Sequence, residues 1–222
     1  MAPSPGIIAR GPWVPSAVEA RWLDDHYEPP AAATAAADAA ITALAERGSP
    51  SHDGLGARFV SHREVDGRLV IEMQPARWGL RLVDGDASQS MAALCVTRAH
   101  DGRWLAGRRA AWLSTWAGRW ALGAGGAVDV GESPAETLTR ELMEEWQLTA
   151  DRVQVDALVR LPHQMIMVVG QAWLPEGADE QLVMDSEHDA YAWWPASVDD
   201  WPPEADEPLR RMAALLASAG PA

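Results

Sequence analysis

Residues 126–148 read GAVDVGESPAETLTRELMEEWQL, and the pattern of this segment is the strongest indication of fold in the chain. Its centre begins with Ser133-Pro134-Ala135-Glu136, in which a serine precedes a proline and a glutamate follows three residues after the serine. This pattern is a capping box with proline at the first helical position. The sequence therefore predicts a helix that begins near Ser133.

The predicted helix has one apolar face and one anionic face. Bulky apolar residues recur every four positions and predict a stripe that packs on a core: Leu138, Leu142 and Trp146. On the adjacent face Glu141 lies beside both Glu144 and Glu145, and each like-charge pair costs roughly 0.2–0.5 kcal/mol without a cation. Arg140 alone cannot neutralise three carboxylates. Because Mg²⁺ is typically held by one or two carboxylates and substrate phosphates, the cluster indicates chemistry on phosphate esters.

A glycine pair precedes this helix. Gly125 and Gly126 follow the apolar run Trp120-Ala121-Leu122, and glycines allow a tight turn and a close approach of the backbone to a ligand. A strand, a glycine loop and a helix are thus expected in series.

The whole stretch resembles the Nudix box, G-x5-E-x7-R-E-U-x-E-E-x-G-U, in which U is a bulky aliphatic residue. Eight of its nine defined positions match: Gly126, Glu132, Arg140, Glu141, Leu142, Glu144, Glu145 and Leu148. Gln147 stands where the family has its last glycine, and Ala124 replaces the proline that commonly precedes the glycine pair. Neither change removes a carboxylate, but Gln147 alters the helix C-terminus, where a left-handed residue is usual.

The resemblance implies a metal-dependent reaction. Glu141 and Glu145 would bind Mg²⁺ directly, Glu144 would help directly or through water, and a carbonyl of Gly125 or Gly126 would complete the site. Mn²⁺ would be able to replace Mg²⁺ in this site. Arg140 would orient Glu141 or Glu132, and water would attack one phosphorus of a diphosphate linkage in a nucleoside diphosphate joined to another group.

Four further residues are candidates for the site. Arg108 and Arg109 end a predicted strand where Nudix proteins often bind substrate phosphate; because neighbours on a strand alternate, only one can face the site. Glu187 precedes a tryptophan by six residues and is a candidate metal ligand or general base; a solvated loop acid is the alternative. Trp116 could stack on a nucleobase, although packing is the commoner role of tryptophan. His188 is expected to have no role.

Two other functions remain open. The segment from Gly107 to Ser133 also resembles isopentenyl-diphosphate isomerases, which place a catalytic cysteine in the region that reads Trp120 to Gly126 here, where this chain has none. A catalytically silent Nudix module that binds a nucleotide is the third hypothesis. Retention of all three carboxylates disfavours it.

The expected fold is α/β (α+β), a Nudix-type α/β/α sandwich with a mixed sheet, at residues 87–222. Residues 1–86 are expected to form an N-terminal extension of helices and a small antiparallel sheet. In the extension, residues 1–16 are expected to be irregular, with helices at 17–26 and 31–47 and strands at 57–65, 68–74 and 77–83, the first two joined by Asp66-Gly67. In the second part, strands are expected at 90–97, 103–106, 120–124, 153–161, 164–174 and 190–194, and a helix at 204–218.

Composition limits the partners. The formal net charge of −14 argues against a nucleic-acid or anionic-membrane surface, so a small nucleotide or diphosphate is the expected partner. The single Cys95 lies in an apolar run and is expected to be a buried, reduced thiol, which suits a cytoplasmic protein. The sequence shows neither a secretory signal nor a membrane span. A homodimer is possible.

Overall fold

The structure is a computed structural model that describes residues 4–48, 53–85, 89–113 and 116–218. The helices are α1 (Ala31–Glu46), α2 (Pro134–Trp146) and α3 (Glu207–Ser218). The strands are β1 (Gly6–Trp13), β2 (Val18–Trp22), β3 (Leu55–Val65), β4 (Arg68–Arg77), β5 (Met91–Arg98), β6 (Trp104–Arg109), β7 (Trp120–Leu122), β8 (Ala124–Ala127), β9 (Arg152–Arg160), β10 (Ile166–Trp173) and β11 (His188–Trp194). None of the helices in the described ranges combines the length and apolar character needed to cross a bilayer.

The larger of two sheets has the strand order β1-β9-β10-β5-β6-β11. Strand β8 pairs with the first part of β5, and β7 pairs with β6. Strands β5 and β10 are parallel, whereas the other pairs are antiparallel, so the sheet is mixed.

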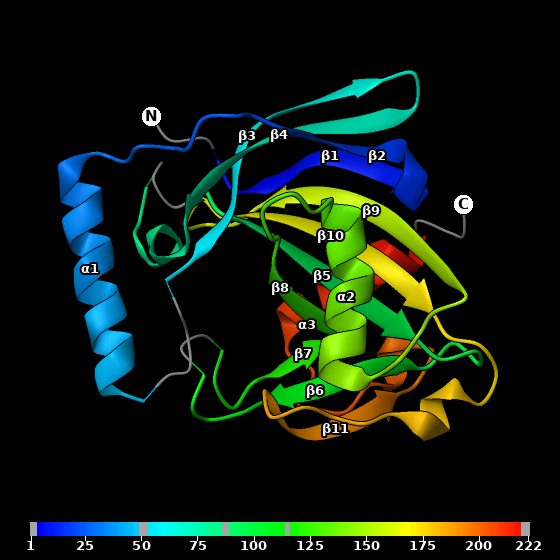
Figure 1. Ribbon diagram of the computed structural model, residues 1–222. Helices are drawn as coiled ribbons and strands as arrows, with labels where there is room; N and C mark the ends of the chain where they lie inside the picture. The colour runs from blue at the N-terminus through cyan, green and yellow to red at the C-terminus, as the bar shows by residue number, and fades with distance from the viewer. Residues whose placement is uncertain (1–3, 49–52, 86–88, 114–115, 219–222) are drawn as a thin grey trace.

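One helix covers each face of this sheet. Figure 1 shows α2 in front of the sheet and α3 behind it. Neighbouring residues of β5 enter different cores: Cys95 packs in the core with Leu138 of α2, and Val96 packs in the core with Leu209 of α3. This alternation is expected of a strand buried on both faces. The predicted α/β/α sandwich is confirmed.

The smaller sheet has the order β2-β4-β3, with α1 beside it (Figure 1). Strands β3 and β4 form the hairpin that Asp66-Gly67 predicted, and both turn residues have positive φ, 50° and 74°. Strand β2 runs parallel to β4, so this sheet is mixed and not purely antiparallel.

Three sequence predictions in the N-terminal region were wrong. The expected helix at 17–26 is strand β2, and the expected irregular segment contains β1, which pairs with β9. The expected strand at 77–83 is instead the 3-10 helix η2 (Trp78–Leu82). There the chain turns tightly against α1: a Cβ on Gly79 would lie 3.0 Å from Asp53 Oδ1 and 3.1 Å from Ile41.

The N-terminal region and the larger sheet share one apolar core. Phe59 of β3 and Ile71 of β4 pack in the same cluster as Leu138 of α2. Because β1 also lies in the larger sheet, the boundary between residues 1–86 and 87–222 does not coincide with a break in packing. Whether these parts are separate domains stays a prediction.

Candidate active site

Helix α2 begins and ends with defined caps. The Ser133 amide donates to the Glu136 carboxylate at 2.8 Å, and the Ala135 amide donates to Ser133 Oγ at 3.3 Å, which confirms the predicted capping box. At the other end Gln147 adopts the left-handed conformation, with φ 53° and ψ 34°. Gln147 thus keeps the backbone geometry for which a glycine would be favoured.

The glycine pair of β8 lets two glutamates approach the backbone. The Gly125 amide donates to Glu145 Oε1 at 2.9 Å. A Cβ on Gly126 would lie only 2.2 Å from Glu141 Oε1, so no larger residue fits there without displacing that carboxylate. The two glycines therefore bring carboxylates and backbone together on one side of the sheet.

Arg140 holds three carboxylates at once. Its guanidinium donates to Glu132 at 2.9 Å, Glu141 at 2.7 Å and Glu144 at 2.9 Å, and also to the Ala127 carbonyl at 2.9 Å. Hydrogen bonding to Glu132 is the largest of the effects that raise the pKa of Arg140. Arg140 therefore fixes the carboxylate of Glu132, which precedes α2, and those of Glu141 and Glu144 in its second half.

Glu141 and Glu145 are acidic groups in an unfavourable environment. Their exposed fractions are only 7 % and 4 %. Burial raises the pKa of Glu141 to about 7 and raises that of Glu145 well above its usual value. Glu145 Oε2 is buried and accepts no hydrogen bond from the described residues. An unpaired buried carboxylate oxygen beside a second carboxylate is chemistry suited to a hard divalent cation.

Glu144 lies at the rim of this pair. Its side chain is 57 % exposed, and its contact is the ion pair with Arg140. Within the described ranges no group of three or more His, Cys, Asp or Glu side chains is arranged to hold a metal. The metal roles of Glu141, Glu144, Glu145 and the glycine carbonyls therefore stay predictions.

Glu187 is brought to the same place from the start of β11. It forms an ion pair with Arg109 at 3.4 Å, and its charge contributes to the raised pKa of both Glu141 and Glu145. Burial raises the pKa of Glu187 as well. Arg108 instead pairs with exposed Asp189 at 2.6 Å. Of the two candidate arginines, Arg109 is the one whose contact is with the carboxylate cluster.

His188 was expected to have no role, yet it touches the site. It is buried against the Trp146 ring, with centroids 4.3 Å apart. Its Nδ1 lies 3.2 Å from Asp185 Oδ1, and its Nε2 lies 3.7 Å from Glu145 Oε2. Burial lowers the pKa of His188. In the sequence, the position of His188 next to Glu187 was a sign that it could lie near the site. Its contact with Glu145 could not be predicted, because that contact depends on how β11 pairs with β6.

The tryptophans before the glycine loop differ in their surroundings. Trp120 packs on Trp194 with centroids 5.6 Å apart. Trp116 is 54 % exposed, and its ring lies 5.4 Å from the Arg119 guanidinium carbon. A stacking role for Trp116 stays a prediction.

One protein-family model and several solved structures are similar to this chain. The model of the NUDIX domain matches residues 89–216. No curated protein matches the chain. The MutT NUDIX hydrolase from Burkholderia pseudomallei is 22 % identical with a TM-score of 0.47, over 57 % of this chain and 97 % of that one. The MutT protein from Methanosarcina mazei Go1 is 23 % identical with a TM-score of 0.43, over 58 % and 93 %. The Nudix hydrolase RenU from M. smegmatis is 23 % identical with a TM-score of 0.42, over 60 % and 89 %.

Proposed function

The chain belongs to the NUDIX family of hydrolases, which act on phosphoric anhydride bonds, and we propose that it hydrolyses the diphosphate linkage of a nucleoside diphosphate joined to another group, using Mg²⁺ or, as a substitute, Mn²⁺. One observation carries the proposal. Two buried carboxylates, Glu141 and Glu145, lie against a glycine backbone, and one of their oxygens has no hydrogen-bond partner among the described residues.

The donor set fits the proposed cation. Glu141 and Glu145 would bind it directly, Glu144 would bind directly or through water, and a carbonyl of Gly125 or Gly126 would add a further oxygen. All of these are the oxygen ligands that Mg²⁺ prefers. When bound, the cation lowers the pKa of water and offsets charge on the phosphoryl oxygens.

The protein's own groups divide the remaining work. Arg140 keeps Glu141 and Glu132 in place through its hydrogen bonds. The Glu187 carboxylate, with its pKa raised by burial, accepts the proton of the attacking water. The water oxygen forms a bond to one phosphorus as the bridging P–O bond breaks, and the departing phosphate keeps the bridging oxygen. Arg109, which forms an ion pair with Glu187 at 3.4 Å, would bind a phosphate of the substrate.

A substrate screen tests this function. Purified protein with Mg²⁺, and in parallel with Mn²⁺, is incubated with nucleoside triphosphates, ADP-ribose, NADH, dinucleoside polyphosphates and thiamine diphosphate, and the phosphorylated products are separated by chromatography. We expect Glu141→Gln to raise the activation free energy by about 4 kcal/mol, which lowers turnover roughly 10³-fold. Glu64→Gln, which removes an exposed carboxylate of β3, is the matched control. Full activity of Glu141→Gln would overturn the assignment.

The two other functions have less support. Cys95, the single cysteine, is fully buried in the core that contains Leu138 of α2, here called the α2-side core. Burial raises its pKa to about 12, so it is unsuited to isomerase chemistry. Incubation with isopentenyl diphosphate tests this directly through formation of the dimethylallyl isomer. A silent binding module would show no product with any substrate. The buried free thiol also leads us to propose a cytoplasmic location.

A further inference from the structure

A cleft lies between the N-terminal region and the strand that carries the glycine pair. One wall comes from β3 and η2, including Ala57, Trp78 and Arg81, and the other comes from Met91 and Ala127. Ala127 follows Gly126, the residue in contact with Glu141. The cleft therefore ends one residue from the glycine that contacts Glu141, and residues outside the 89–216 family match form much of its lining.

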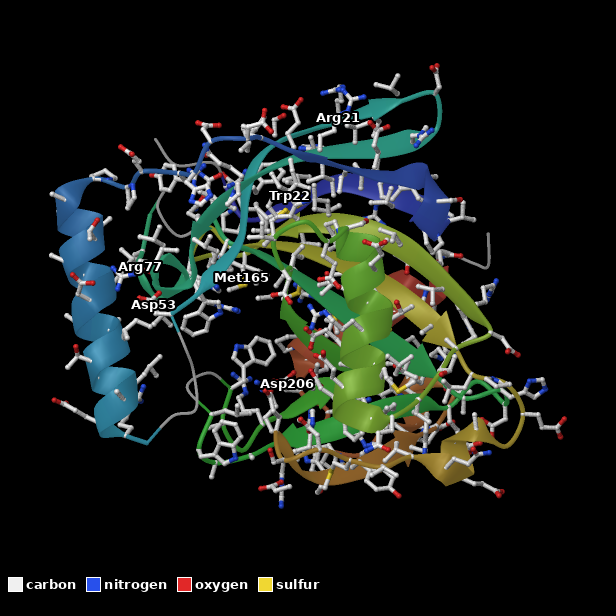
Figure 2. The ribbon with its side chains drawn as sticks, viewed as in Figure 1. Arg21, Trp22, Asp53, Arg77, Met165 and Asp206 are labelled. Carbon is white, nitrogen blue, oxygen red and sulfur yellow. The ribbon has the colours of Figure 1, made fainter. Side chains whose placement is uncertain are left out.

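The wall that carries Arg81 is firmly held. Asp53 accepts hydrogen bonds from the Gly79 amide at 2.9 Å and from Arg77, which also pairs with Asp38 of α1 at 2.6 Å. Figure 2 shows Asp53 and Arg77 close together beside α1. These contacts anchor η2, and the guanidinium of Arg81 lies 5.2 Å from the ring of Trp78 in the same turn.

Arg81 differs from three nearby arginines in having no carboxylate partner among the described residues. Arg77, Arg109 and Arg140 each have a carboxylate partner. The guanidinium of Arg81 forms no hydrogen bond or ion pair with any residue in the described ranges, although its side chain is partly buried. Burial is the largest effect on its pKa, which is lowered, and the charges of Glu141, Arg109 and Glu187 also act on it.

A partly buried arginine that has no hydrogen bond or ion pair lowers the stability of the ligand-free protein. Its charge persists because guanidinium is protonated at all ordinary pH values, and partial desolvation without an ion pair is unfavourable. A phosphate group would supply the missing oxygen acceptors in the planar geometry that guanidinium matches. The phosphate that fits this place is one of the diphosphate substrate. The carboxylates whose charges act on Arg81, Glu141 and Glu187, are the ones assigned to cleavage.

We propose that Arg81 binds a phosphate oxygen of the diphosphate substrate, so that the N-terminal region completes the substrate site. This inference rests on the proposed function and adds a residue that the family match does not contain. The ligand class is a diphosphate group, and because the cleft encloses only about 10 Å³, the group would bind against the Arg81 guanidinium at the mouth of the cleft. In this role Arg81 acts on binding of the diphosphate itself, whatever group is attached to it.

Binding of methylene diphosphonate, a diphosphate analogue that cannot be hydrolysed, tests this. Isothermal titration calorimetry with excess Mg²⁺ compares the full-length wild type with Arg81→Gln and Arg81→Lys. The matched control is Arg21→Gln on β2, where Arg21 pairs with Glu19 at 2.6 Å and lies away from Asp53 and Arg77 in Figure 2. We expect Arg81→Gln to weaken binding roughly 10- to 100-fold, Arg81→Lys to recover part of the loss, and Arg21→Gln to stay within about twofold of wild type.

Thermal unfolding without ligand separates binding from a structural role. Because Arg81 has no ion pair to lose, Arg81→Gln is expected to melt at the wild-type temperature or higher. A lower melting temperature with unchanged affinity, equal losses in Arg81→Gln and Arg21→Gln, or no binding by the wild type would each overturn the inference. If Arg81→Gln does not fold, Arg81→Lys provides the comparison: affinity at or above that of wild type would overturn the inference, and weakened binding would support it.

The two proposals can fail separately. Binding of methylene diphosphonate that depends on Arg81, without turnover of any substrate in the screen, would sustain this site and contradict the hydrolytic function. Turnover that is unchanged in Arg81→Gln would sustain the function and contradict this site.

Discussion

The two buried faces of α2 are alike in exposure and opposite in chemistry. Leu138, Leu142 and Trp146 on one face are almost completely buried in the α2-side core, and Glu141 and Glu145 on the other are nearly as inaccessible. Burial of a large apolar side chain stabilises the folded protein by about 1.5–3 kcal/mol. Burial of a carboxylate costs free energy, and the raised pKa values of Glu141 and Glu145 express that cost.

The difference shows how one helix can serve stability and function without conflict. The apolar face holds α2 on the sheet tightly enough to keep the carboxylates where they are unfavourable in the metal-free protein. Such local cost is typical of functional sites. Four measurements test this contrast between the two faces.

The largest effect is expected on the apolar face. Leu138 is fully buried and packs so closely on β10 that a Cβ on Gly170 would lie 2.6 Å from it. Leu138→Ala should lower the free energy of unfolding by about 3–4 kcal/mol, measured by urea denaturation. Met143→Ala, on the exposed side of the same helix, should change it by less than about 0.5 kcal/mol. Similar losses in both variants would contradict the division into faces.

The second effect is a pH dependence on the carboxylate face. Burial raises the pKa of Glu141 to about 7, above its unfolded value, so the folded state binds more protons between these values and loses stability as pH rises through that window. In metal-free protein, the wild type should lose about 2–3 kcal/mol more than Glu141→Gln between about pH 4.5 and 7.5. Denaturation in a chelator at several pH values measures this. Parallel curves for the two proteins would show that Glu141 is not destabilising.

The third effect separates stability from metal binding at Glu145. In Glu145→Gln, the amide oxygen can still accept from Gly125, and the new NH₂ faces His188 Nε2. Without metal, this variant should be about 1–2 kcal/mol more stable than wild type. Its Mg²⁺ affinity, measured by calorimetry, should fall by more than roughly tenfold. A less stable variant with unchanged Mg²⁺ affinity would make Glu145 a structural residue.

The smallest effect is expected at Gln147, which ends α2. Gln147 has φ 53° and an exposed side chain, so Gln147→Gly should relieve left-handed strain and raise the free energy of unfolding by about 0.5–1 kcal/mol. Gln147→Ala, which keeps the strain, is the control. A loss of stability in the glycine variant would mean that the glutamine side chain itself stabilises the helix end.

The sequence predicts the structure best where a residue's conformation is determined by its neighbours along the chain. The capping box at Ser133 predicted the start of α2, and Asp66-Gly67 predicted the hairpin of β3 and β4. It failed for β1 and β2, whose partners β9 and β4 are distant in sequence. In those segments the pairing, and not local propensity, determines the conformation.

The same distinction applies to the candidate site. Glu141 and Glu145 could be singled out because their spacing on one helix is local. The contact of His188 with Glu145 and the place of Arg81 beside the cleft depend on tertiary packing of β11 and η2. No spacing in the sequence connects Arg81 to a helix sixty residues away.

Strand β1 has a consequence for how the chain is made. Its residues leave the ribosome well before those of β9, but Gly6 pairs with Arg160 of β9. At about 5–20 residues per second, a nascent chain needs roughly 8–30 s to supply that partner. During this interval Ala9 and Trp13, which are buried in the finished sheet, have no strand to pair with β1. Strand β1 therefore stays without its partner strand for most of synthesis, and during that time its apolar residues are open to chaperones.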